Sequence, residues 1–151
     1  MNFRTLHINE QRGWRGGEQQ AAYLMGGLVG RGHPTFLACR EGSALLEPGR
    51  VSSEVMTFPL AFRNELDVFT ARRIGRIIRE HEIDIVHAHT AHGHMMACLG
   101  RKFAGRGKVV VSRRVDFVPK QTFTNRIKYG MPDRYVAISR KIGDVLREFG
   151  I

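Results

Sequence analysis

Short apolar runs alternate with longer segments of helical periodicity along the whole chain. Strand-like runs occur at residues 3–9, 34–40, 55–60, 83–88, 108–112 and 134–138. Between the first two, apolar residues recur three and four positions apart, as in an amphipathic helix, at Ala21, Leu24, Met25 and Leu28. Strands that alternate with helices form right-handed βαβ units. We therefore predict an α/β fold: a Rossmann-like, doubly wound sheet of about six mainly parallel strands with helices on both faces.

The same periodicity predicts three further helices. Asp67 can cap one helix, which exposes an arginine row and turns inward Ala71, Ile74 and Ile78. A helix after the fourth strand is expected to bury Met95, Cys98, Leu99 and Phe103. Ser139 can cap the last helix, which has an apolar face of Ile142, Val145, Leu146 and Phe149. Residues 41–54 predict a loop with one short helical turn, whereas residues 113–132 show no period.

Length and composition limit the number of domains and the class of protein. A length of 151 residues suits one domain, residues 1–151, with a core of its own. No apolar run reaches the 18 residues that a membrane-spanning helix needs, and residues 1–20 lack the apolar stretch of a signal peptide. Cys39 and Cys98 stand in apolar surroundings, which predicts two buried free thiols in a reducing cytosol.

The net charge of +10 is concentrated near the C-terminus. Residues 101–151 hold 13 Lys and Arg against four Asp and Glu, whereas residues 1–100 hold 11 against 10. A basic excess attracts phosphate groups on lipids, nucleic acids or phosphorylated sugars, although it is also typical of a solvated surface. Phe117, Phe123 and Tyr129 interleave with basic residues here, a mixture that suits nucleic acid. No RNA- or DNA-binding signature accompanies it, so we expect an acceptor-binding or membrane-facing segment instead.

Ligands of doubly wound sheets bind beyond the carboxyl ends of the strands, which directs attention to residues 10–18, 88–94 and 112–118. The first of these loops contains Gly16 and Gly17 followed by Glu18. Backbone amides at such glycines, at the start of a helix, can cradle a phosphate. The spacing is neither G-x-G-x-x-G nor a P-loop, and a tight turn that merely needs glycine explains it equally well.

The second loop follows two histidines, His87 and His89, that share one side of the fourth strand. We expect His87 to be a structural residue, and His89 to lie at the strand end, contact a substrate oxygen and titrate near neutral pH. A His-x-His pair can also bind zinc, but the nearby candidates for further ligands are only Asp84 and Asp116. His92 and His94 are expected to line the start of the next helix.

The third loop carries Arg113 and Arg114 just past the fifth strand. Guanidinium groups bind phosphate or carboxylate in a bidentate manner, so the pair is predicted to clamp an anionic group. We expect Gly17, His89 and Arg113 to meet at one rim of the sheet.

In combination, these motifs resemble the N-terminal domain of family 4 glycosyltransferases, which have the GT-B architecture. The resemblance rests on Gly16-Gly17-Glu18, on residues 84–89 (DIVHAH) and on residues 135–139 (YVAIS) with the apolar helix that follows. It implies transfer of a sugar from a nucleotide-diphospho-sugar, with retention, to a glycan or lipid-linked acceptor. Lipopolysaccharide or another cell-envelope glycan is the acceptor that the basic charge favours.

The resemblance also assigns roles. His89 would be the catalytic residue that touches the donor sugar. Gly16, Gly17, Glu18, Arg113 and Arg114 would bind the donor diphosphate or the acceptor. No metal or other cofactor is expected, and nucleic acid is not an expected partner. The family's C-terminal nucleotide-sugar domain, with its E-x7-E motif, is not found within residues 1–151, so this chain is expected to be inactive, or nearly so, alone.

Two other readings stay open from the residues alone. One is a metal-dependent hydrolase that uses His87 and His89. The other is a non-enzymatic module that binds polyanions through residues 101–151. The expected location is the cytoplasm, with a peripheral contact to the inner, anionic face of the membrane.

Overall fold

The computed structural model describes residues 1–64, 66–115 and 118–151 of the chain. Its centre is a six-stranded sheet in the order β3-β2-β1-β4-β5-β6, in which every pair of neighbours is parallel. The strands are β1 (Thr5–Asn9), β2 (Thr35–Arg40), β3 (Met56–Leu60), β4 (Ile85–Ala88), β5 (Lys108–Arg113) and β6 (Arg134–Ala137). The predicted fold class is therefore confirmed, with each strand boundary within two residues of its prediction.

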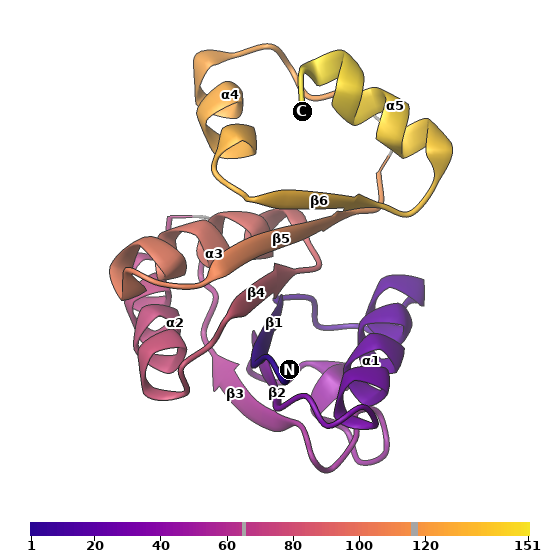
Figure 1. The fold of residues 1–151 in the computed structure, drawn as a ribbon, viewed down its shortest axis with the longest axis vertical. Coiled ribbons are helices and arrows are strands. Elements are labelled where there is room, and N and C mark those ends of the chain that lie inside the picture. Colours follow the sequence, from indigo (N-terminus) through magenta and orange to yellow (C-terminus); the bar gives the residue numbers. More distant parts are fainter. Residues whose placement is uncertain (65, 116–117) are drawn as a thin grey trace.

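Helices cover both faces of the sheet (Figure 1). They are α1 (Gly16–Val29), α2 (Val68–Glu80), α3 (Ala91–Ala104), α4 (Phe123–Gly130) and α5 (Arg140–Phe149), with a short 3₁₀ turn, η1 (Ala44–Leu46), in the predicted loop. The α2 and α3 helices pack together on one face, over a core that includes Leu6, Ile8 and Val86. On the other face, α1 packs over Leu37 and Cys39.

Side-chain alternation along the strands explains this division. In β1, Leu6 and Ile8 point toward α2 and α3, so Thr5, His7 and Asn9 point toward the face that carries α1. All five β1 residues are buried, as expected for a central strand of a parallel sheet. The polar residues of β1 therefore lie inside the protein and need hydrogen-bond partners there.

The caps predicted for two helices are present. The Asp67 carboxylate accepts a hydrogen bond from the Thr70 amide at 3.1 Å, and the Ser139 hydroxyl accepts one from the Ile142 amide at 3.3 Å. The inward faces predicted for α2 and α5 are buried, and the arginines of α2 are exposed. Cys39 and Cys98 are buried free thiols, as predicted.

Two predicted helix faces are wrong in part. Leu24 of α1 is exposed, and α1 ends at Val29 with a cap at Gly30, before the predicted stop at Gly32. In α3, Phe103 is 40% exposed, and the face against α2 is formed by smaller residues such as Gly100. A Cβ at Gly75 of α2 would lie only 2.8 Å from the Phe103 Cβ, so these two helices approach through glycines rather than large side chains.

The segment without a predicted structure contains α4, of which no residue is buried. Its exposed apolar side chains include Phe123 and Ile127. Phe117, which belonged to the aromatic and basic pattern, and the candidate ligand Asp116 lie outside the described residues. Among the helices of the described chain, none is long and apolar enough to cross a membrane.

Candidate functional site at the carboxyl edge of the sheet

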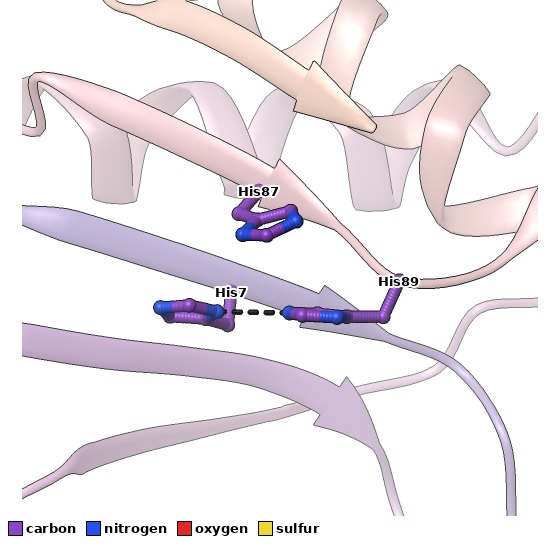
Figure 2. Close-up of side chains that lie close together, drawn as sticks. All are labelled: His7, His87 and His89. Atoms are coloured by element: carbon purple, nitrogen blue, oxygen red, sulfur yellow. Dashed lines mark hydrogen bonds between the residues drawn. The ribbon is translucent and has the colours of Figure 1, made fainter. Parts of the chain in front are cut away.

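Three histidines gather on the α1 face of the sheet (Figure 2). His7 of β1 and His87 of β4 are paired in register, and His89 follows the end of β4. Their rings stack, with centroids 4.3 Å apart for His87 and His89 and 5.2 Å apart for His7 and His89. Strand register thus places His7 beside His87, and His89 lies two residues further along on the same face.

Hydrogen bonds fix the tautomers of two members. Nη2 of Arg114 lies 3.3 Å from Nδ1 of His89, and a guanidinium can only donate, so Nδ1 is an acceptor. The proton of His89 then resides on Nε2, which donates to Nδ1 of His7 at 2.9 Å. His7 must in turn carry its proton on Nε2, a buried atom without a hydrogen-bond partner among the described residues. His87 is separately held by Ser112, with 2.8 Å between Nε2 and the hydroxyl oxygen.

Burial keeps all three imidazoles neutral. Desolvation, with a smaller contribution from His87, lowers the pKa of His7 to about 3. Desolvation and then the positive charge of Arg114 lower the pKa of His87 to about 4. The pKa of His89 is held well below 6.5, first by burial and then by its charged or chargeable neighbours. The prediction that His89 titrates near neutral pH is therefore wrong, because the side chain is only 4% exposed.

Arg114 connects the three loops. Its Nη1 donates to the carbonyl oxygen of His89 at 2.8 Å, and its Nε donates to the Gln20 side chain of α1 at 3.3 Å. A Cβ placed on Gly17 would lie 3.6 Å from Cδ of Arg114. Gly17, His89 and Arg114 thus meet at one place on the carboxyl edge of the sheet.

Arg113 has a different environment. Its Nη1 donates to the Tyr129 hydroxyl at 2.6 Å, and its guanidinium carbon lies 5.3 Å from the centre of that ring. The side chain is 7% exposed. Arg113 and Arg114 line the same small cavity, although their side chains leave the backbone on opposite faces and only Arg114 bonds His89. Their joint clamp on an anionic group stays a prediction.

The first loop combines open glycines with a helix cap. Gly16 has no atom within 4 Å of a would-be Cβ, and neither Gly16 nor Gly17 has a positive φ. A tight turn therefore does not require these glycines, and they leave space beside the α1 N-terminus. Glu18 is buried, and its oxygens accept hydrogen bonds from the Arg15 amide at 3.0 Å and the Asn9 amide group at 3.2 Å. Glu18 thus holds the loop in place.

Two cavities lie along this edge. One of about 560 Å³ adjoins the first loop and is lined by Glu10, Gln11, Arg12, Gly13, Arg15, Glu18, Arg40, Ala91 and His92. The other, about 110 Å³, lies toward β6; its walls include His89, Arg113, Arg114 and Tyr129. His94, at the start of α3 as predicted, also lines it and contacts the Lys128 carbonyl oxygen at 3.0 Å. Both cavities are lined by Ala91, so they lie next to each other along this edge.

The histidine trio has the composition of a metal site, with one nitrogen from each residue within 4.8 Å of the others. The third histidine of the group is His7. Asp84, which the sequence offered as a candidate ligand, instead accepts a hydrogen bond from the Arg4 amide at the opposite end of β4. A transition metal needs three free nitrogen lone pairs that point to one centre. Here the lone pair of His89 Nδ1 accepts a hydrogen bond from Arg114, that of His7 Nδ1 accepts one from His89, and the nearby guanidinium raises the cost of adding a dication. The arrangement fits a hydrogen-bond chain better than a metal centre.

The sequence model of Glycosyltransferase Family 4 matches residues 14–151, which include Gly16, Gly17 and Glu18 of the first loop and the whole of the second and third loops. The chain belongs to glycosyltransferase family 4. No curated protein sequence matches it significantly.

Solved structures with the same fold include glycosyltransferases. One is a glycosyltransferase from Rickettsia africae, with 18% identity and a TM-score of 0.79 over 99% of this chain and 40% of that one. A second is the lipopolysaccharide outer core galactosyltransferase WaaB, with 14% identity and a TM-score of 0.71 over 98% and 42%. Anabaena Alr3699/HepE in complex with UDP and glucose has 17% identity and a TM-score of 0.70 over 99% and 42%. The family 4 chain therefore spans about two fifths of the length of these structures.

Proposed function

We propose that this family 4 chain is the N-terminal, acceptor-binding half of a glycosyltransferase. The complete enzyme would move a sugar from a nucleotide-diphospho-sugar to a glycan or lipid-linked acceptor, with retention of anomeric configuration. The meeting of Gly17, His89 and Arg114 at one edge carries this proposal, because it offers amides, an imidazole and a guanidinium to an oxygen-rich anionic ligand. The complex of Anabaena Alr3699/HepE with UDP and glucose supports a nucleotide-sugar as donor.

The chemistry breaks the bond between the anomeric carbon and the diphosphate oxygen and forms one to an acceptor hydroxyl oxygen. The proton of that hydroxyl passes to the leaving diphosphate. Negative charge grows on the diphosphate, so the Arg114 guanidinium and the amides near Gly16 and Gly17 would stabilise the transition state more than the ground state. None of these steps requires a metal ion bound by the residues of this edge.

His89 would act as a neutral hydrogen-bond acceptor rather than as a base. Its Nε2 proton is committed to His7, and its low pKa disfavours proton uptake. If an anionic ligand draws the Arg114 guanidinium away, Nδ1 of His89 becomes free to accept a hydrogen bond from a donor-sugar hydroxyl. Binding of the diphosphate and orientation of the sugar would then be coupled through one side chain.

A second domain that holds the nucleotide-sugar is the second part of the proposal. The solved relatives are more than twice as long as this chain, which supports a partner domain that holds the nucleotide. We expect the coding region beyond residue 151 to encode a second α/β domain with an E-x7-E motif, and the isolated chain to show little or no transfer.

The experiment compares the isolated chain with the protein translated from that longer coding region. Release of UDP or GDP from nucleotide-sugars is measured with cell-envelope glycans as acceptors, and NMR of the product gives its anomeric configuration. The longer protein should turn over, and His89→Ala should lower kcat about 100-fold, a typical effect for one polar transition-state contact. Normal turnover by the isolated chain, or a longer protein without any transfer, would refute the proposal.

Contact with an anionic membrane would bring a lipid-linked acceptor to this edge from the cytoplasmic side. The exposed Phe123 and Ile127 of α4 stand beside exposed basic residues such as Lys120 and Arg126, which supports this placement. Binding to vesicles with phosphatidylserine but not to pure phosphatidylcholine vesicles, weakened by Phe123→Ser, is the expected result. Equal binding by the wild type and Phe123→Ser would contradict an inserted α4.

A further inference from the structure

The larger cavity has an anion-attracting mouth. Arg12 and Arg15 are exposed on its rim, and Arg40 is half-buried at the end of β2. Neither Arg12 nor Arg15 has a side-chain hydrogen bond or an ion pair with any described residue. Arg40 donates from Nη2 to the Phe62 carbonyl oxygen at 2.6 Å, while its buried Nε has no partner among the described residues. Three guanidiniums thus face this space with donors to spare.

The floor of the same cavity is acidic. Glu10 and Glu18 are each 5% exposed and both line it. Glu10 accepts hydrogen bonds from the Gln11 side chain at 2.9 Å and from the Thr90 hydroxyl, and Glu18 is tied to Asn9 and Arg15. Each carboxylate oxygen can accept two hydrogen bonds, so lone pairs remain for a ligand. The carboxylates are fixed in position, while the guanidiniums on the rim are free to adapt.

We propose that this cavity binds an acceptor sugar that carries an anionic group, either a phosphate monoester or a carboxylate. This inference rests on the proposed function, because it treats the cavity as the acceptor side of a sugar transfer. Sugar hydroxyls would donate to Glu10 and Glu18 on the floor, and the anionic group would lie among Arg12, Arg15 and Arg40 at the mouth. A volume of about 560 Å³ accommodates such a small ligand.

The charge pattern favours an acceptor over the donor diphosphate in this space. A diphosphate seated on the floor would face the two buried carboxylates, and like charges in a partly buried site repel strongly. A sugar ring has hydroxyl donors that suit carboxylates and keeps its single anionic substituent away from them. The described residues that line the smaller cavity beside Arg114 include no carboxylate, so that side of the edge remains for the diphosphate.

Trp14 provides a direct test, because it is the chain's single tryptophan and stands between two residues of the cavity lining. Its half-buried ring packs against the hydrophobic cluster beneath α1, with the Arg50 guanidinium 4.5 Å from the ring centre. Its fluorescence is titrated in the 151-residue protein with glucose 6-phosphate, glucuronate, glucose, inorganic phosphate and UDP, without any nucleotide-sugar present. Saturation-transfer NMR on the same samples reports binding independently of the fluorophore.

We expect glucose 6-phosphate or glucuronate to bind at least tenfold more tightly than glucose, inorganic phosphate or UDP, and the tighter of the two identifies the anionic group. The double variant Arg12→Gln/Arg15→Gln should lose about tenfold or more in affinity, since each charge-assisted hydrogen bond typically contributes that much. The matched control, Arg72→Gln/Arg76→Gln, removes the same charge from exposed positions of α2 and should bind as the wild type does.

Four results would overturn the inference. They are equal affinity for glucose and its anionic derivatives, tightest binding of UDP, no binding of either anionic sugar to the folded protein, and equal losses of affinity in both double variants. The outcome is separate from that of the proposed function. Binding of glucose 6-phosphate or glucuronate by a protein whose longer form transfers no sugar would refute the function and keep the site. Transfer to neutral acceptors by a protein that binds no anionic sugar would refute the anionic-sugar site and keep the proposed function.

Discussion

Acid should weaken this fold through the buried histidine trio, and His7 provides the sharpest test. His7 is 1% exposed in the folded chain, where its pKa is about 3 instead of 6.5. Because the folded pKa is lowered, the full stability is present above the unfolded pKa and is lost as the pH falls toward the folded value. In the window between these two values, the unfolded chain takes up a proton that the folded chain excludes.

The size of the effect follows from that window. At a pH of about 5, the unfolded pKa lies about 1.5 units above the pH, and each unit corresponds to 1.36 kcal/mol, so His7 alone reduces the free energy of unfolding by about 2 kcal/mol. His87 and His89 add to the loss in the same direction. A decrease of this size is a large share of the ~5–15 kcal/mol that typically stabilises a domain.

The assay is urea unfolding of the wild type and of His7→Asn at a pH of about 7.5 and of about 5. Asparagine does not titrate in this range, and its carbonyl oxygen can accept the Nε2 proton of His89 where Nδ1 of His7 now stands. The loss of stability on acidification should be about 2 kcal/mol smaller in His7→Asn than in the wild type. The matched control is Leu37→Val, which trims the residue paired with His7 on β2 but keeps the imidazole. Identical acid losses in the wild type and His7→Asn would refute the reasoning.

Three further predictions follow from the packing and the site. Gly75→Ala should destabilise the protein by about 1–3 kcal/mol in urea unfolding, because its Cβ would lie 2.8 Å from that of Phe103 and 3.1 Å from the Gly100 carbonyl oxygen; unchanged stability would show that α2 and α3 can separate freely. Asp67→Ala should cost about 1 kcal/mol through loss of the α2 cap, whereas Asp67→Asn should keep most of it. Elemental analysis of protein purified without a histidine tag should find no stoichiometric transition metal, while one zinc per chain would favour the hydrolase.

The sheet could be predicted from sequence because strands buried on both faces leave a strong local signal. Helix faces were harder, and α3 shows why. Large apolar residues were assigned to its core side, yet the closest approach to α2 runs through Gly75 and Gly100. Large apolar side chains dominate the helical pattern in a sequence, whereas two helices can approach closely only where small residues such as glycine lie between them. The α4 helix gave no signal because none of its residues is buried.

The candidate site was predicted in part, and His7 is the residue that was missed. Within β1 it looks like the polar member of an alternating strand, which in an exposed sheet would face solvent. Only the register between β1 and β4 places it opposite His87 and within 2.9 Å of His89. Register between strands that are 80 residues apart in sequence cannot be obtained from local pattern. The signal available beforehand was a histidine in a strand that had to be buried on both faces.

One rule nevertheless links the strand register to the chemistry of this edge. His7, His87 and Val110 are paired across β1, β4 and β5, so residues an even number of positions further along their strands share the same face. This alternation of side chains places those of His89 and Arg114 on the α1 face and that of Arg113 on the opposite face of the sheet. The contact between Arg114 and His89 is thus a consequence of sheet geometry. A one-residue insertion between Ser112 and Arg113 would put Arg113 where Arg114 now lies and turn Arg114 to the opposite face, so that Arg113 would set the tautomer of His89.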